Sequence, residues 1–262
     1  MTSPPTMTHP RDRLLTLYGR KPVLEVLEDR TVTVDKVLLA RNADGPVVAA
    51  ILAAARARGV AVQRVTPEEV TRLSRNGRQD QGAVVDVAAP RMAALDAALE
   101  GPLATGPAQI FLLDGLTTPG NIGLILRTAT AAGCEGIVLP RKGSPEVGPL
   151  VIKASAGVAY RAPILRVATA IEGANLLKSK GFSLFGLSMG GADLFAASLP
   201  ERVALVLGNE STGISPEVQA RLDGTLAIPM AGGVESLNVA VAAAVVAYEL
   251  TRRRRASRAA GS

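Results

Sequence analysis

Three short segments carry the polar side chains that could take part in chemistry, and each follows a run of apolar residues. They span residues 114–127, 208–215 and 229–238. Open parallel sheets gather ligand groups at the carboxyl ends of their strands, so these segments are expected to form one site. Helix capping is an alternative role for Asn121 and Ser236. The polar residues of the three segments are Asn121, Arg127, Asn209, Glu210, Ser211, Ser236 and Asn238.

The chain contains only one histidine and one cysteine, which limits the catalytic groups and metal ligands that it can supply. The single histidine, His9, falls in a leader expected to be disordered, so the reaction must proceed without a histidine base, and no metal site is expected. Cys134 has no histidine to pair with and is expected to be a small buried residue. No GxGxxG follows a strand and no GxxxxGK[ST] occurs, which disfavours dinucleotide-binding and P-loop proteins.

The segment from Ile228 to Val239 organises the chain. It begins as a buried strand, TLAIPM, which Pro229 must end because proline has no N–H and a fixed φ. Gly232 and Gly233 let a ligand approach the main chain. Ser236 is a plausible N-cap for a helix running towards Arg252. A polar loop between a strand and a helix N-terminus is a typical ligand site of α/β proteins.

Alternating strands and helices predict an α/β protein of two domains. The first, residues 17–89, is expected to be a small α/β sandwich that follows the leader 1–16. Residues 90–108 are rich in proline, glycine and alanine and predict a linker. Residues 109–252 predict a mostly parallel sheet covered on both faces. A basic tail, residues 253–262, completes the chain.

Charge is uneven along the chain. Residues 1–89 carry +3, residues 90–250 carry −2, and the five arginines after Thr251 add +5. Basic ends suit contact with a polyanion, although a solubilising tail fits the arginines equally well. The loop 72–82 presents Arg72, Arg75 and Arg78, which we interpret as phosphate contacts, with a solvated loop as the alternative. With one cysteine, no signal peptide and no apolar run of about 18–20 residues, we expect a cytoplasmic protein without a membrane span.

Three motifs then give the chain a specific resemblance. DGLTTPGNIGLILRTATAAG, LVLGNESTGIS and IPMAGGVESLNVAVAAAVVAYE resemble, in order and spacing, the three motifs of the SpoU (TrmH-type) RNA ribose 2′-O-methyltransferases of the SPOUT superfamily. The first domain resembles the ribosomal protein L30e-like substrate-binding domain of the ribosomal-RNA branch. The resemblance implies a SPOUT domain whose C-terminal segment, from about Gly208, is threaded into a deep trefoil knot, a rare exception to ordinary chain connection.

The same resemblance implies the cofactor and the roles of the site residues. S-adenosylmethionine would be bound mainly by backbone groups of Gly208, Ile228, Met230 and Leu237, and of Leu187. Arg127 would activate the ribose hydroxyl; because arginine stays protonated, stabilising the alkoxide and orienting phosphate is the alternative to acting as a base. The remaining catalytic positions, assigned to ribose positioning and site architecture, are Asn121, Glu210, Ser236 and Asn238.

Substrate and assembly also follow by resemblance. The substrate would be 23S ribosomal RNA, with transfer RNA or a catalytically silent RNA-binding or ribosome-assembly role as alternatives. The enzyme would be a homodimer, and the apolar helix 237–250 agrees with burial on two sides. One departure stands out: Asp80-Gln81-Gly82 replaces a frequent His-Gln-Gly, which weakens phosphate contact there and leaves the choice of RNA open.

Overall fold

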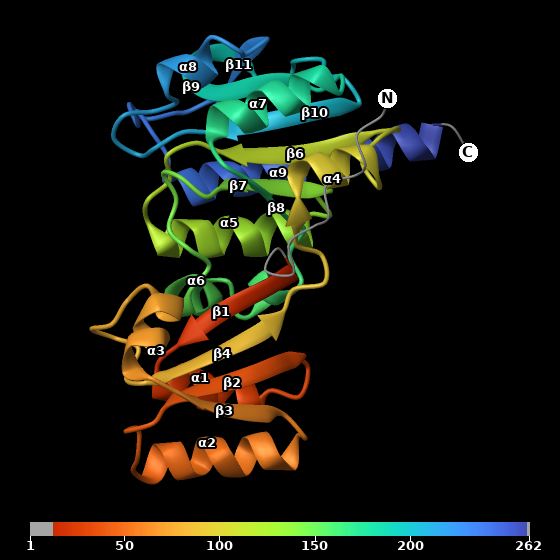
Figure 1. Ribbon diagram of the computed structural model, residues 1–262. Coiled ribbons are helices and arrows are strands. Elements are labelled where there is room, and N and C mark those ends of the chain that lie inside the picture. Colours follow the sequence, from red (N-terminus) through yellow and green to blue (C-terminus); the bar gives the residue numbers. More distant parts are fainter. Residues whose placement is uncertain (1–12, 261–262) are drawn as a thin grey trace, which may run out of the picture.

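The protein consists of two α/β units stacked one above the other (Figure 1), in a computed structural model that describes residues 13–260, with side chains described to residue 256. His9 and most of the expected leader lie outside the described residues. Within them, no helix is long and apolar enough to cross a membrane.

The smaller unit holds a four-stranded mixed sheet in the order β1-β4-β2-β3. Strand β4 runs antiparallel to both of its neighbours, and β2 and β3 are parallel. Its core is built mainly from valine and leucine side chains of the strands and of α1 and α2. The elements are β1 (Leu14–Tyr18), α1 (Arg20–Glu28), β2 (Val34–Ala40), α2 (Pro46–Ala57), β3 (Ala61–Val65), α3 (Pro67–Ser74) and β4 (Ala83–Ala88).

The larger unit is a seven-stranded sheet in the order β11-β9-β10-β6-β7-β8-β5, with every neighbouring pair parallel. Helices cover both of its faces, as expected for apolar parallel strands. The elements are β5 (Ala93–Ala94), α4 (Leu95–Glu100), β6 (Ala108–Leu113), α5 (Pro119–Ala131), β7 (Gly136–Pro140), α6 (Pro149–Ala154), a 3₁₀ turn (Val158–Tyr160), β8 (Ile164–Val167), α7 (Ala170–Ser179), β9 (Ser183–Asp193), β10 (Arg202–Leu207), α8 (Pro216–Gln219), β11 (Gly224–Ala227) and α9 (Val239–Ala260).

Alternate residues of each strand feed two separate cores. Phe111 and Leu113 of β6 face one core together with α5 and α9, whereas Ile110 and Leu112 face the other with α4 and α7. This is the period-two alternation of a strand, and here both sets of side chains are buried. The sequences of the central strands are therefore continuous runs of apolar residues.

Two segments differ from the expected boundaries. Leu14, Leu15 and Thr16, at the end of the expected leader, form the start of β1, and Leu15 is 5% exposed. Within the expected linker, β5 pairs with β8 at the edge of the large sheet, and α4 buries Leu95 and Leu99. Apolar side chains hidden among proline, glycine and alanine thus attach residues 93–100 to the larger unit.

The two units meet through a polar and an apolar contact. Arg75, the C-cap residue of α3, forms an ion pair of 2.9 Å with Glu146 in the loop that precedes α6. Ile152 and Tyr160 pack against buried residues of both units. Burial raises the pKa of the Tyr160 hydroxyl, as expected for a phenol enclosed between two cores.

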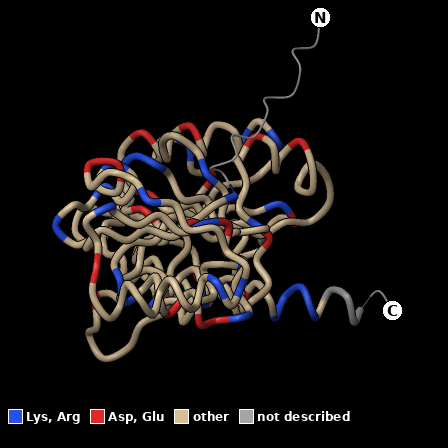
Figure 2. Tube along the Cα trace, turned by 60° about the horizontal axis from the view of Figure 1, so that its bottom comes forward, with Lys and Arg blue, Asp and Glu red and all other residues tan. Residues whose placement is uncertain are grey.

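Helix α9 continues beyond the expected end near Arg252. Arg253 donates to the carbonyls of Leu194 and Ala197, and Arg254 donates to Glu135 at 2.6 Å. Figure 2 shows this basic stretch where α9 leaves the body of the molecule. Arg252 and Arg253 also bind Glu249. Arg253 and Arg254 therefore attach the end of α9 to the body of the molecule, whereas Arg252 pairs within the helix.

Candidate active site

Side chains from all three polar segments meet in one hydrogen-bond chain. Asn121, in the first turn of α5, donates its Nδ2 to Oε1 of Glu210 at 2.5 Å. Asn238 donates its Nδ2 to Oδ1 of Asn121 at 3.1 Å. Glu210 belongs to the segment after β10, and Asn238 immediately precedes α9. The three segments therefore lie together, as expected.

Buried polar contacts hold the first two segments together beneath that chain. Asp114, 6% exposed, accepts the backbone N–H of Ser215 at 2.7 Å. Asn209 donates its Nδ2 to the carbonyl of Gly115 at 2.8 Å, and its Oδ1 accepts two N–H groups of its own turn. Neither residue was assigned a specific role from the sequence, although Asp114 directly follows β6 and Asn209 was among the polar residues of the second segment.

The start of α9 differs from the sequence prediction. Asn238, rather than Ser236, occupies the capping position, because its Oδ1 accepts the N–H groups of Ala240 at 2.9 Å and Val241 at 3.4 Å. Ser and Asn are about equally good N-cap residues, so the sequence did not distinguish them. The amide of Asn238 joins the helix start to Asn121 while its carbonyl oxygen caps the helix.

A cavity of about 200 Å³ lies between the end of β9 and the loop before α9. Thr225 of β11 pairs with Gly186, and Leu226 pairs with Ala192, so residues 187–191 of β9 have no partner on β11. This irregularity supplies one wall. The lining is mostly apolar: Leu187, Ser188, Met189, Leu226, Ile228, Met230, Glu235, Ser236, Leu237 and Ala242.

Four of the five residues expected to contact a cofactor line this cavity: Leu187, Ile228, Met230 and Leu237. Gly208 does not line it. A Cβ added at Gly208 would lie 2.4 Å from the backbone of Gly213 and Ile214, so a glycine is needed there for the turn 209–213 to close tightly. Ser236, assigned to catalysis, lines the cavity as well. Glu235 brings a carboxylate to the apolar lining and was missed, although it directly precedes Ser236.

Arg127 lies further along α5 on its exposed side. In the part of the chain that the structure describes, its guanidinium has neither a hydrogen-bond nor an ion-pair partner. Arg127 and Asn121 form no hydrogen bond with each other, which is consistent with their separation of six residues along the chain. An exposed guanidinium with all of its donors unused is suited to phosphate or to a developing oxyanion.

The three arginines assigned to RNA differ in their surroundings. Arg72 pairs with Glu69 at 3.5 Å and Arg75 pairs with Glu146, whereas Arg78 has no intramolecular partner among the described residues. Arg75 thus connects the two units. The Asp80 carboxylate is buried and accepts the Thr71 and Ser74 hydroxyls and the N–H of Gly82. It shapes the turn that carries Arg78.

Cys134 is buried at 2% exposure, as expected. Burial, reinforced by the neighbouring carboxylate of Glu135, raises the pKa of its thiol to about 12. The thiolate needed for nucleophilic chemistry is therefore scarce near neutral pH.

Comparison with known proteins agrees with this architecture. Residues 108–248 match the model of the SpoU rRNA Methylase family, and residues 16–93 match that of RNA 2′-O ribose methyltransferase substrate binding. The chain belongs to the SpoU rRNA methylase family. It is 35% identical, over 91% of its length and 96% of the relative, to the 23S rRNA (guanosine-2′-O-)-methyltransferase RlmB of Xanthomonas axonopodis.

Solved structures show the same fold over both units. A TrmH-family RNA methyltransferase from Porphyromonas gingivalis superposes with a TM-score of 0.61 at 29% identity, covering 93% of this chain and 91% of that one. The SpoU methyltransferase AviRb from Streptomyces viridochromogenes, solved in complex with AdoMet, gives 0.62 at 25% identity over the same shares. The expected class of fold, an α/β protein with a mostly parallel sheet in its larger unit, is confirmed.

Proposed function

We propose that this protein transfers a methyl group from S-adenosylmethionine to the ribose 2′-hydroxyl of a guanosine in 23S ribosomal RNA. The observation that carries the proposal is the Glu210–Asn121–Asn238 chain, which joins three distant segments beside the apolar cavity. The relative named as a 23S rRNA guanosine methyltransferase supports the substrate, because the chain covers nearly all of it.

The residues of the cavity fit S-adenosylmethionine. Apolar side chains of Ile228, Met230 and Leu237 suit adenine, whose edge the neighbouring peptide groups would read. Glu235 adds a carboxylate to the lining, and this charge would attract the positive sulfonium and ammonium groups of the cofactor. The enclosed volume is below the roughly 300–1,000 Å³ typical of ligand pockets, so part of the ligand would lie against the exposed loop 229–238. When bound, S-adenosylmethionine supplies an electrophilic methyl group.

The chain's own residues have to position and activate the hydroxyl. Arg127 would hold an RNA phosphate and stabilise the negative charge that develops on the ribose oxygen as the hydroxyl proton passes to water, as a fixed cation does in an oxyanion site. Asn121, Glu210 and Asn238 would keep the three segments in register with the ribose, and Ser236 would shape the cavity beside it. In-line approach requires such fixed geometry.

The C-terminal segment would be threaded as in a trefoil knot. The three sequence motifs and the similarity of the fold to the SpoU methyltransferase AviRb support this. The enzyme would act in the cytoplasm, where ribosomal RNA is modified.

A homodimer would cover the apolar surface of α9. Val241 is 49% exposed, Tyr248 54%, and Leu124 of the neighbouring α5 43%. Large apolar side chains are thus exposed on α9 and on α5, which pack against each other. Such a surface favours a second copy as the partner.

Mass spectrometry of nucleosides from 23S ribosomal RNA tests the proposal, using cells with and without the gene. We expect one 2′-O-methylguanosine to disappear in the deletion strain and to return with the wild-type gene. Identical methylation in the two strains would refute this substrate. Calorimetric titration of the purified protein with S-adenosylmethionine separates an enzyme from a silent RNA-binding scaffold, which need not bind the cofactor.

A further inference from the structure

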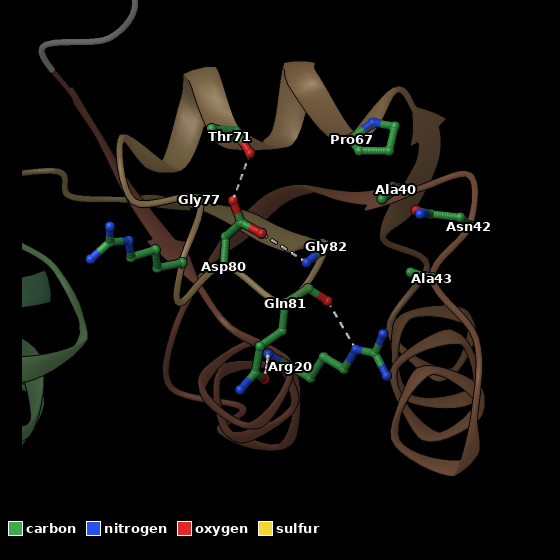
Figure 3. Close-up of a pocket in the computed structure, with 11 residues that line it drawn as sticks. Arg20, Ala40, Asn42, Ala43, Pro67, Thr71, Gly77, Asp80, Gln81 and Gly82 are labelled. Carbon is green, nitrogen blue, oxygen red and sulfur yellow. Dashed lines mark hydrogen bonds between the residues drawn. The ribbon is translucent and has the colours of Figure 1, made fainter.

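The smaller unit contains a second cavity, of about 330 Å³, remote in sequence from the methyl-transfer site. It lies at the end of the small sheet where β1, β2 and β3 finish and β4 begins. Figure 3 shows the cavity between α3 on one side and Arg20 and the loop after β2 on the other. Resting on the proposed function, we infer that this cavity binds one unpaired nucleotide of the substrate RNA.

Small, closely packed residues form the floor of the cavity. Ala40 and Ala43 are 1% and 5% exposed, and the ring of Pro67 forms part of the opposite wall. A Cβ at Gly82, whose φ is +73°, would lie 3.1 Å from the Cβ of Ala40. The small residues thus keep the space open for a flat group, as a base requires.

Fixed donors surround this floor. The guanidinium of Arg20 is held by two hydrogen bonds of 2.9 Å, from Nε to the carbonyl of Gln81, which Figure 3 shows, and from Nη1 to that of Asp44. Its Nη2 has no such bond in the described chain. Arg78 and the amide of Asn42 also line the cavity and are exposed. Two cations suit a phosphate, and an amide can read the edge of a base.

The carboxylate of Asp80, which also lines the cavity, is compatible with the binding of a nucleotide. Both oxygens of Asp80 already accept hydrogen bonds from within the unit, as its contacts with Thr71 and Gly82 in Figure 3 show. A nucleotide supplies a flat apolar face, polar edges and a charged phosphate together. Single-stranded RNA is commonly recognised through such extruded bases.

The cavity also lies on the correct side of the molecule to share one RNA with the active site. Arrowheads of β1 and β6 point to the same side in Figure 1. Arg75, which ends α3, binds Glu146 in the loop that leads from β7 to α6. The ligand ends of the small and large sheets are therefore connected.

The test uses full-length protein and an unmodified 23S ribosomal RNA transcript, with RNA affinity measured without cofactor. Asn42→Trp fills the cavity without changing charge, and Arg78→Glu reverses a charge within it. Arg30→Glu is the matched control, since it makes the same charge change at an exposed arginine of the smaller unit outside the cavity. We expect both cavity variants to weaken RNA binding at least tenfold and raise KM for RNA, with the control changing it less than threefold.

Folding and cofactor binding serve as independent readouts. Each variant should keep the wild-type Tm and S-adenosylmethionine affinity, because the cavity is outside the methyl-transfer site. Equal losses in Arg78→Glu and Arg30→Glu, or full RNA binding by Asn42→Trp, would overturn insertion of a nucleotide. Failure of the proposed function appears differently: wild-type protein would then transfer no methyl group to the transcript.

Discussion

Asn238 donates a hydrogen bond of 3.1 Å to Asn121, across a separation of 117 residues. The same Asn238 side chain caps α9, and Asn121 passes the connection on to Glu210. One residue therefore couples the start of the last helix to the site. This arrangement separates two functions within a single amide: its oxygen serves the helix, and its nitrogen serves the site.

Substitutions of Asn238 can separate these functions. Asn238→Ala removes the cap and should lower the free energy of unfolding by about 1 kcal/mol. Asn238→Asp keeps an oxygen for the N–H of Ala240 but cannot donate to Asn121, so stability should be retained while kcat falls at least tenfold. Chemical denaturation and methyl-transfer kinetics measure the two effects. Equal activity in Asn238→Asp and wild type would show that the link to Asn121 is dispensable.

Two adjacent glycines in β9 should respond differently to alanine. A Cβ at Gly191 would lie 2.6 Å from the backbone of Leu226, which lines the cofactor cavity, whereas one at Gly190 would meet nothing within 4 Å. Gly191→Ala should lower the free energy of unfolding by about 1–3 kcal/mol through overpacking. It should also weaken S-adenosylmethionine binding at least tenfold, because β11 must move.

Gly190→Ala is the matched control, and its stability should stay within about 0.5 kcal/mol of wild type. Denaturation curves and calorimetric titration with S-adenosylmethionine measure both variants. If the two variants have the same stability and the same cofactor affinity, the close approach of Gly191 to β11 has no energetic consequence.

Local pattern predicted most elements, and the misses share a physical cause. Strand β8 is difficult to predict from local pattern because Arg166 interrupts its apolar run; the structure buries Arg166 at 6% exposure and places Glu146 3.4 Å away. That partner comes from a distant loop. Likewise, Ser236 and Asn238 have similar capping propensities, and only the tertiary contact with Asn121 identifies the cap.

The site divides in the same way. The three polar segments could be predicted to converge because each follows an apolar strand. The cavity wall could not, since it depends on the register shift between β9 and β11. The sequence also does not show that Arg75 forms an ion pair with Glu146, whereas Arg78 has no such partner in the described chain.

Stability at low pH should depend on Glu249. Hydrogen bonds from Arg252 and Arg253 lower the pKa of this buried carboxyl from 4.5 to about 2. A depressed folded-state pKa means that the contribution is fully present above the unfolded value and is lost as pH falls from about 4.5 to 2. Glu249→Gln should reduce the free energy of unfolding by about 2 kcal/mol at pH 7, as expected for charged hydrogen bonds.

The difference between wild type and Glu249→Gln should therefore shrink as pH falls through this window. Denaturation at a series of pH values measures it, at a constant ionic strength because salt screens charges. A difference that stays constant down to pH 2 would contradict a role for the charged form.

Arg127 gives the most direct test of the chemistry. Its guanidinium is exposed on α5 without an intramolecular partner among the described residues, so removing it breaks no internal hydrogen bond. Arg127→Ala should reduce kcat at least 100-fold, a typical loss for a group that stabilises an oxyanion. S-adenosylmethionine affinity should remain within twofold, because Arg127 does not line the cofactor cavity.

Two further variants define the role of this side chain. Arg127→Lys keeps the charge but loses the planar fork, so we expect activity between those of Arg127→Ala and wild type. Arg221→Ala removes another exposed arginine, outside both cavities, and should leave turnover unchanged. Single-turnover methyl transfer to the 23S transcript measures all three. Wild-type turnover in Arg127→Ala would exclude Arg127 from the mechanism, whereas loss in Arg221→Ala as well would indicate that overall positive charge matters rather than this guanidinium.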